Sequence, residues 1–155
     1  MSLLFIVGCA APRIHAFYTI AGSGQVEIDN NELEVYLESN PTTGYQWSVE
    51  IRGSGLKLEE SDFEAASDNT DGQEDTLETL GEDRHENAVG VGGFERFEFK
   101  GNAAGQQTIT FTYERTFDPS EDDRQLVLET ETDEQGNIIQ SKMTEDGREL
   151  GHSKN

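Results

Sequence analysis

The sequence predicts an all-β protein, a β-sandwich of seven to eight strands. Runs in which apolar and polar residues alternate recur along the chain, for example over residues 33–38 and 107–115. This period of two is typical of strands that bury one face. Turn signals such as Gly53-Ser54-Gly55 separate the runs, and no segment has the period of an amphipathic helix.

Each expected strand is bounded by such a turn signal. Asp29-Asn30-Asn31 separates the first two runs, and residues 101–105 separate two later ones. The run that follows Gly55 is short and interrupted, and it is expected to form an edge strand. In chain order, the strands are expected at residues 25–29, 33–38, 46–52, 56–64, 94–100, 107–115 and 125–130.

The segment Asn40-Pro41-Thr42-Thr43-Gly44 lies between two of these runs and predicts a stiff loop. Pro41 fixes its φ angle at about −65°, and Gly44 supplies a position at which φ can be positive. A rigid loop tip on a sheet scaffold is a common way to build a binding site. Tyr45 and Trp47 alternate along the following strand, and at least one of them is expected in the core.

Two further segments lie next to expected strands. Gly90-Val91-Gly92-Gly93 precedes the run at 94–100, and its glycines would let a partner approach the backbone, although a tight turn between strands is the alternative. Arg115-Thr116-Phe117 follows the strand at 107–115. We call residues 40–44, 90–93 and 115–117 the first, second and third loops. All three are expected to meet at one end of the sandwich.

In this order, the three loops resemble the chagasin family, whose members are protein inhibitors of papain-like cysteine proteases. The family's loop motifs read N-P-T-T-G-x-x-W, G-x-G-G and R-P-W/F. Residues 40–47 and 90–93 match the first two in full, and the third departs at Thr116, where the family usually has proline. The resemblance covers about residues 24–132. It implies an immunoglobulin-like sandwich that inhibits reversibly and without covalent chemistry.

The resemblance also implies which residues contact the protease. Thr42 would enter the catalytic centre, the second loop would lie along the substrate groove, and the third loop would grip the wall on the primed side. Thr116 removes one constraint on φ from the third loop. The implied protease-binding residues are Asn40, Pro41, Thr42, Thr43, Gly44, Gly90, Val91, Gly92, Gly93, Arg115 and Phe117.

The composition is strongly acidic. The 155 residues include 32 Asp and Glu against 11 Lys and Arg, a formal net charge of −21 at pH 7. Nucleic acid and anionic membrane surfaces are therefore not expected as partners, because phosphate contacts need clustered basic residues. Acidity is also typical of disordered segments, but here it extends through the alternating runs, which favours a salt-adapted, halophilic protein.

Residues 1–23 are expected to be the remnant of a signal and a linker. Ile6-Val7-Gly8-Cys9 follows a short apolar run and resembles the lipobox of secreted lipoproteins, in which the cysteine is acylated. The basic region of a signal peptide is missing, so a chance cysteine is the alternative. With Cys9 as the lipidation site, the protein is expected to be extracellular or on the cell surface, with this anchor as its only membrane contact.

Two segments lie outside the expected strands. Residues 65–88 are expected to be an acidic loop within the inhibitor domain, and a near match to a calcium loop in it begins with Ser67 in place of Asp. Residues 133–155 are expected to be a polar C-terminal tail, although Gly136-Asn137 could turn a small hairpin there. The inhibitor domain itself is expected over residues 24–132.

Catalysis finds no support in the sequence. His15, His85 and His152 are isolated, no Cys and His form a recognisable catalytic motif, and zinc would need clustered Cys and His. No catalytic residue, metal or cofactor is therefore expected, and a hydrolase is disfavoured. We expect a monomeric inhibitor, with a surface adhesion or binding module on the same scaffold as the alternative. Pro-Thr-Thr-Gly at a loop tip favours the inhibitor.

Overall fold

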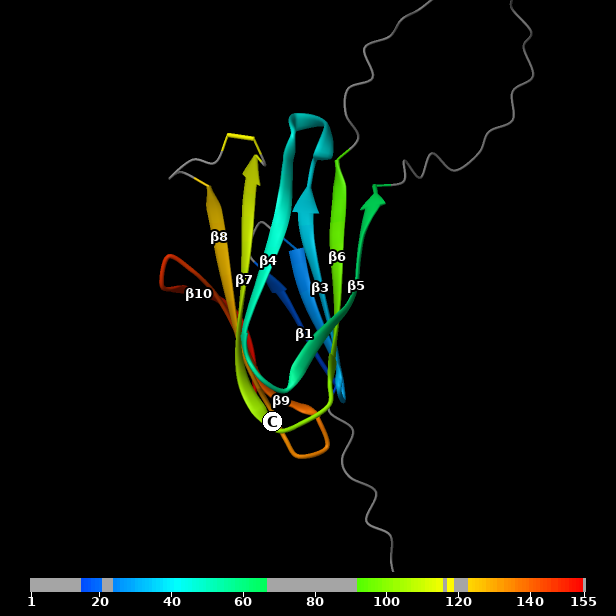
Figure 1. Ribbon diagram of the computed structural model, residues 1–155, viewed down its shortest axis with the longest axis vertical. Coiled ribbons are helices and arrows are strands. Elements are labelled where there is room, and N and C mark those ends of the chain that lie inside the picture. Colours follow the sequence, from blue (N-terminus) through cyan, green and yellow to red (C-terminus); the bar gives the residue numbers. More distant parts are fainter. Residues whose placement is uncertain (1–14, 21–23, 67–91, 116, 119–122, 155) are drawn as a thin grey trace, which may run out of the picture.

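The computed structural model describes residues 15–20, 24–66, 92–115, 117–118 and 123–154. These residues form ten β-strands in two antiparallel five-stranded sheets that pack face to face as a sandwich (Figure 1). The prediction of an all-β sandwich is confirmed, although the strands number ten instead of seven to eight. Apart from the strands, the described residues contain a short 3₁₀ turn, η1 (Pro41–Thr43), in the first loop.

The two sheets are built from strands that are mixed in chain order. The first sheet has the order β1-β2-β3-β6-β5, and the second has the order β10-β9-β8-β7-β4. The strands of the first sheet are β1 (His15–Ile20), β2 (Gly24–Asp29), β3 (Glu32–Ser39), β5 (Leu56–Ala65) and β6 (Gly93–Gly101). The strands of the second sheet are β4 (Tyr45–Gly53), β7 (Gly105–Arg115), β8 (Arg124–Thr132), β9 (Ile138–Glu145) and β10 (Arg148–Lys154).

The core lies between the sheets and is filled from one face of each strand. On β3, Leu33, Val35 and Leu37 are fully buried, as the two-residue period predicts. The ring of Phe111 on β7 reaches across to β6, with its centroid 5.2 Å from that of Phe97. Burial of each large apolar side chain contributes about 1.5–3 kcal/mol, so this core fixes the strands that carry the loops.

The strand register brings the three loops to one end of the sandwich. On the first sheet, Ser39 at the end of β3 is paired with Gly93 at the start of β6. On the second sheet, Tyr45 at the start of β4 is paired with Arg115 at the end of β7. The first loop joins β3 to β4 and therefore crosses from one sheet to the other between these two pairs (Figure 1). The expectation that the loops meet is confirmed for their described residues.

Both ends of the described chain differ from expectation. Residues 15–20, expected in a linker, form the edge strand β1, and residues 138–154, expected in a polar tail, form β9 and β10 and complete the second sheet. Ser141 and Met143 of β9 are fully buried, and Ser141 Oγ donates a hydrogen bond to Tyr18 Oη of β1 at 3.0 Å. These strands have few apolar residues, so their sequence pattern only weakly predicts a strand. Their strand conformation depends on packing against neighbouring strands, which the local sequence does not show.

Several predicted features lie outside the described residues. They are the lipobox cysteine, the acidic loop beyond residue 66 with its calcium-like pattern, two positions of the second loop and one of the third: Cys9, residues 67–88, Gly90, Val91 and Thr116. Within the described ranges, no helix has the length and apolar character to cross a membrane. The same ranges contain no group of three or more His, Cys, Asp or Glu that could hold a metal ion.

Candidate functional site

The first loop is stiffened by its own hydrogen bonds. Thr43 N donates to Asn40 O at 3.1 Å, and Gly44 N donates to Pro41 O at 3.0 Å. Gly44 has φ of +80°, in the left-handed region that favours glycine. The hydroxyl of Thr42 donates to Asn40 Oδ1 at 2.6 Å. Pro41, Thr42 and Thr43 are all exposed, so the loop presents a rigid tip to solvent, as its sequence predicts.

The base of the first loop is held by two buried or half-buried aromatic side chains. Asn40 N donates to Tyr113 Oη at 3.1 Å. Trp47 is 5 % exposed, and its indole Nε1 donates to Glu38 O at 3.0 Å. The rings of Trp47 and Tyr113 lie 4.9 Å apart between centroids. The prediction that Tyr45 or Trp47 belongs to the core is thus confirmed for Trp47.

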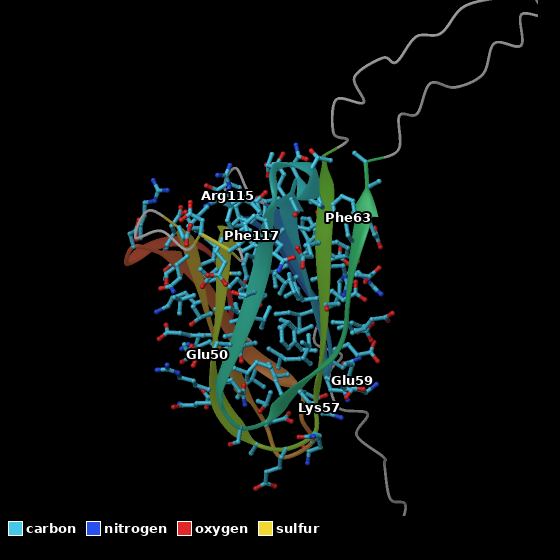
Figure 2. The ribbon with its side chains drawn as sticks, turned by 45° about the horizontal axis from the view of Figure 1, so that its top comes forward. Glu50, Lys57, Glu59, Phe63, Arg115 and Phe117 are labelled. Atoms are coloured by element: carbon cyan, nitrogen blue, oxygen red, sulfur yellow. The ribbon has the colours of Figure 1, made fainter. Side chains whose placement is uncertain are left out.

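The third loop packs against the first. The guanidinium of Arg115 lies 4.7 Å from the ring centroid of Tyr45, a distance typical of a cation–π contact. The ring of Phe117 lies 3.7 Å from the point where a Cβ at Gly44 would stand. Phe117 is nevertheless 82 % exposed. Figure 2 shows Arg115 and Phe117 at the same end of the molecule, and both side chains are open to a partner.

The two described glycines of the second loop have different surroundings. A Cβ at Gly93 would stand 2.2 Å from Glu64 O and 2.8 Å from the ring of Phe63. Among the described residues, a Cβ at Gly92 would meet Ser39 O at 3.9 Å and nothing nearer. Gly93 is therefore required by close packing against β5, whereas the position of Gly92 is open. The sequence alone assigned both glycines to the approach of a partner.

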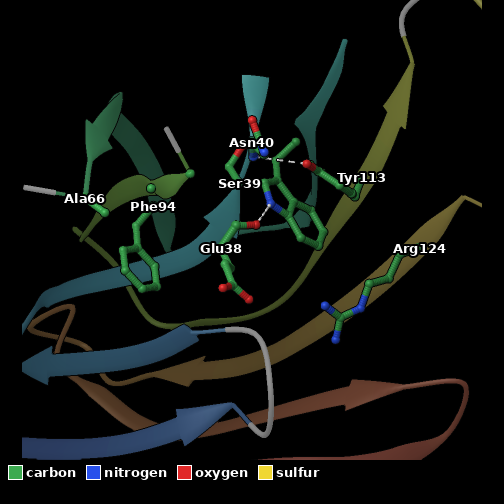
Figure 3. Close-up of a pocket in the computed structure, with 10 residues that line it drawn as sticks. Glu38, Ser39, Asn40, Ala66, Phe94, Tyr113 and Arg124 are labelled. Carbon is green, nitrogen blue, oxygen red and sulfur yellow. Dashed lines mark hydrogen bonds between the residues drawn. The ribbon is translucent and has the colours of Figure 1, made fainter. Parts of the chain in front are cut away.

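A cavity of about 650 Å³ opens beneath the loops, between the two sheets (Figure 3). Its walls include Trp47 and Tyr113, and Gly92 and Asn40 bring the second and first loops to its rim. Ser39 also lines it, 3 % exposed, and its hydroxyl has no hydrogen-bond partner among the described residues. The first and second loops therefore lie above a cavity instead of above a packed core. On this side, hydrogen bonds hold them in position.

One side chain at this end was not predicted from the sequence. Glu95 of β6 is half-buried, and its Oε2 accepts a hydrogen bond from Trp47 N at 3.3 Å. Burial raises the pKa of this carboxyl above its ordinary value, and the bond from Trp47 lowers it by a smaller amount. A signal was available: Glu95 has the same parity as Phe97 and Phe99, which face the core.

The arrangement is suited to binding and offers no catalytic chemistry. The exposed tip of the first loop, the open backbone at Gly92 and the exposed ring of Phe117 lie at the same end of the sandwich. Among the described residues, no nucleophile is hydrogen-bonded to a His or Lys base, and His15 and His152 lie in β1 and β10, outside the loops. Loops that are already held by internal hydrogen bonds can enter the cleft of another protein without reorganising.

Comparisons with known proteins give the family. The family model described as Chagasin family peptidase inhibitor I42 matches residues 27–129. The chain is 27 % identical over 95 residues to amoebiasin-1 of Entamoeba histolytica, an alignment that covers 61 % of this chain and 76 % of amoebiasin-1. No solved structure matches the chain. Because the family model spans more than half of the sequence and includes all three loops, this chain belongs to the chagasin family of peptidase inhibitors and is not an enzyme.

Proposed function

We propose that the protein is a reversible, non-covalent inhibitor of papain-like cysteine proteases that inserts its three loops into the active-site cleft. The family implies that such proteases are bound. The observation that carries the proposal is the register of the loop-bearing strands, in which Ser39 is paired with Gly93 and Tyr45 with Arg115. This register supports a single binding edge made of segments that are far apart in the sequence.

In this proposal, the first loop blocks the catalytic centre. Thr42 is exposed at the tip of a turn in which the amides of Thr43 and Gly44 are already bonded. A papain-like enzyme needs a peptide carbonyl presented to its thiolate, and the side chain of Thr42 offers none. Because Pro41 and Gly44 hold the turn before docking, little conformational entropy is lost on binding. The inhibitor should therefore be recovered uncleaved.

The other two loops would contact the walls of the cleft. Gly92 would lie along the substrate groove, where its open position lets the backbone approach the enzyme. Arg115 and Phe117 would grip the primed side through stacking and apolar contact. Tyr45 beneath Arg115 and Gly44 beside Phe117 supply contacts that can compensate for the proline missing at Thr116.

Titration of a papain-like enzyme with the folded protein tests this function. We expect stoichiometric, reversible loss of activity, recovery of intact inhibitor, and no effect on serine proteases or metalloproteases. The assay is run at a salt concentration at which both proteins are folded. If the folded protein inhibits none of several papain-like enzymes, the proposal fails and a binding module without inhibitory activity becomes the better account.

We further propose that the mature protein is exported and anchored through acylated Cys9. The support is the sequence Ile6-Val7-Gly8-Cys9 alone, which lies outside the described residues. Mass spectrometry of the protein from its own host tests this proposal. A lipid-modified cysteine at the mature N-terminus is expected, and an unmodified Met1 or Ser2 on protein from inside the cell would contradict it.

A further inference from the structure

A carboxylate joins the strand after the second loop to the strand after the first loop. Glu95 lies on β6, two residues beyond Gly93, and Trp47 lies on β4, three residues beyond Gly44. The two strands belong to different sheets. Glu95 Oε2 accepts a hydrogen bond from the backbone amide of Trp47 at 3.3 Å. This bond therefore bridges the sandwich directly behind the two loops.

The bond satisfies a particular need of β4. Among the described strands, β4 lies at the edge of the second sheet and has β7 as its one sheet neighbour. Amides on its free edge therefore have no partner in another described strand. The amide of Trp47 belongs to a residue that is 5 % exposed. A buried amide without an acceptor costs about 1–3 kcal/mol. Glu95 supplies that acceptor from across the sandwich.

Placing a carboxylate at position 95 costs hydration free energy, which the hydrogen bond to Trp47 offsets. The side chain has the parity of Phe97 and Phe99, and β6 buries an apolar ring at both of those positions. A half-buried carboxylate loses hydration, and burial accordingly raises the pKa of Glu95. An apolar residue would avoid this cost but could not hold the amide of Trp47.

We infer that Glu95 is a positioning residue for protease binding, which fixes the second loop relative to the first through the amide of Trp47. This inference rests on the proposed function, because it concerns the binding edge described above. The two loops stand at the rim of a cavity of about 650 Å³, so on the side that faces the cavity they depend on hydrogen bonds more than on packing. Without the Glu95 bond, the loops would have to be ordered when the enzyme docks, and affinity would fall.

Three variants test the inference. Glu95→Ala removes the acceptor, and Glu95→Gln keeps an acceptor oxygen of similar reach without the charge. Glu98→Ala is the matched control, since Glu98 lies on the outer face of the same strand, 3.6 Å from Arg96 and away from the loops. Inhibition constants and dissociation rates are measured against one papain-like enzyme in one salt concentration. Hydrogen exchange is followed at the amides of Trp47, of Asn40 and residues 42–44, and of residues 92–93.

We expect Glu95→Ala to weaken inhibition by on the order of ten-fold, mostly through faster dissociation. Exchange at the Trp47 amide and in both loops should accelerate while the rest of the sandwich stays protected. Glu95→Gln should restore both readouts to within about three-fold of the parent, and Glu98→Ala should leave both unchanged. Rescue by Gln separates the hydrogen bond from a general effect of charge or fold.

The inference is overturned if Glu95→Ala inhibits as well as the parent, or if Gln fails to rescue it while staying folded. A parent protein that does not inhibit at all counts against the proposed function instead. In that case the exchange measurements decide alone: equal loop exchange in the parent and in Glu95→Ala shows that Glu95 does not position the loops.

Discussion

The backbone amide of Asn40 donates a hydrogen bond to the phenolic oxygen of Tyr113, 3.1 Å away and 73 residues further along the chain. Asn40 opens the first loop, and Tyr113 lies two residues before the third loop begins. The Tyr113 ring also stacks on that of Tyr45, with 5.3 Å between centroids. One side chain therefore supports the first loop from below and ties it to the strand that leads to the third.

Removing the hydroxyl in Tyr113→Phe should weaken inhibition and lower stability slightly. The ring and its stacking remain, but the amide of Asn40 loses its acceptor, at a cost of about 0.5–1.5 kcal/mol. Tyr36→Phe is the matched control, because the Tyr36 hydroxyl bonds to Glu34 on the outer face of the first sheet, on the body of β3. Equal inhibition constants for the two variants would show that the Tyr113 bond does not orient the first loop.

Thr42→Ala should weaken inhibition by about ten-fold or more, with almost no loss of stability. Thr42 is exposed, so its removal opens no cavity. Within the described residues, the variant loses one internal bond, from the Thr42 hydroxyl to Asn40 Oδ1. Thr108→Ala, in β7 opposite Arg52 near the other end of the sandwich, is the control. Inhibition constants and melting curves decide, and unchanged inhibition by Thr42→Ala would place the binding edge elsewhere.

Gly92 and Gly93 should respond to substitution in opposite ways. Gly92→Glu meets open space and should keep stability within about 0.5 kcal/mol, yet its bulk and charge should abolish tight binding to the enzyme. Gly93→Ala forces a Cβ against Glu64 O and should destabilise the fold by about 1–3 kcal/mol. Denaturant titrations and inhibition constants for both variants test this, and a stable Gly93→Ala would refute the packing account.

The stability of the Glu95→Gln variant relative to the parent protein should increase as pH rises from about 4 to 7. Burial raises the pKa of Glu95 in the folded state, so the folded protein holds this proton more tightly than the unfolded chain, in which Glu titrates at about 4.3. The stability that Glu95 contributes is therefore fully present below the unfolded value and is lost as pH rises through the folded value. Gln has no such loss. Denaturant titrations of parent and variant across this range measure the difference.

Glu145→Gln should show the opposite dependence on pH and is the control for the previous experiment. The hydrogen bond from Arg124 Nε holds the pKa of Glu145 below its ordinary value. Its contribution to stability is present above the unfolded pKa and is lost as pH falls through the folded one. Glu145→Gln should therefore cost more stability at pH 7 than at pH 4. If the stability of both variants relative to the parent changes with pH in the same direction, the local environment does not set the pKa values of these two carboxyl groups.

The melting temperature should rise steadily from 0.1 M to 2 M salt. The formal net charge is −21, and on the outer face of the first sheet Arg96 lies within 4 Å of Glu34, Glu60, Asp62, Glu64 and Glu98. Repulsion among these carboxylates, and among the acidic residues in general, weakens as the screening length falls from about 10 Å at 0.1 M to about 3 Å at 1 M. A melting temperature that is flat over this range, measured by calorimetry, would exclude salt adaptation.

The sequence by itself determined the features that depend on residues adjacent in the chain. The conformation of the first loop follows from Pro41, which fixes its own φ, and from Gly44, which accepts a positive one. The faces of β3 and β7 follow from strict alternation, because successive side chains of a strand point in opposite directions. The family resemblance could be read for the same reason, since the loop motifs are short and contiguous.

Only the tertiary structure decided how distant residues use one another. In the sequence, Gly93 cannot be distinguished from Gly92, and only the packing of β5 against it shows that it must be glycine. Glu95 is one of 32 acidic residues in the sequence, and only the fold shows that it accepts a hydrogen bond from Trp47 of the other sheet. β9 is a strand because it pairs with β8 and β10, and its buried Ser141 meets Tyr18 of β1. In each case the energy comes from contacts between segments far apart in the chain, which a local pattern does not record.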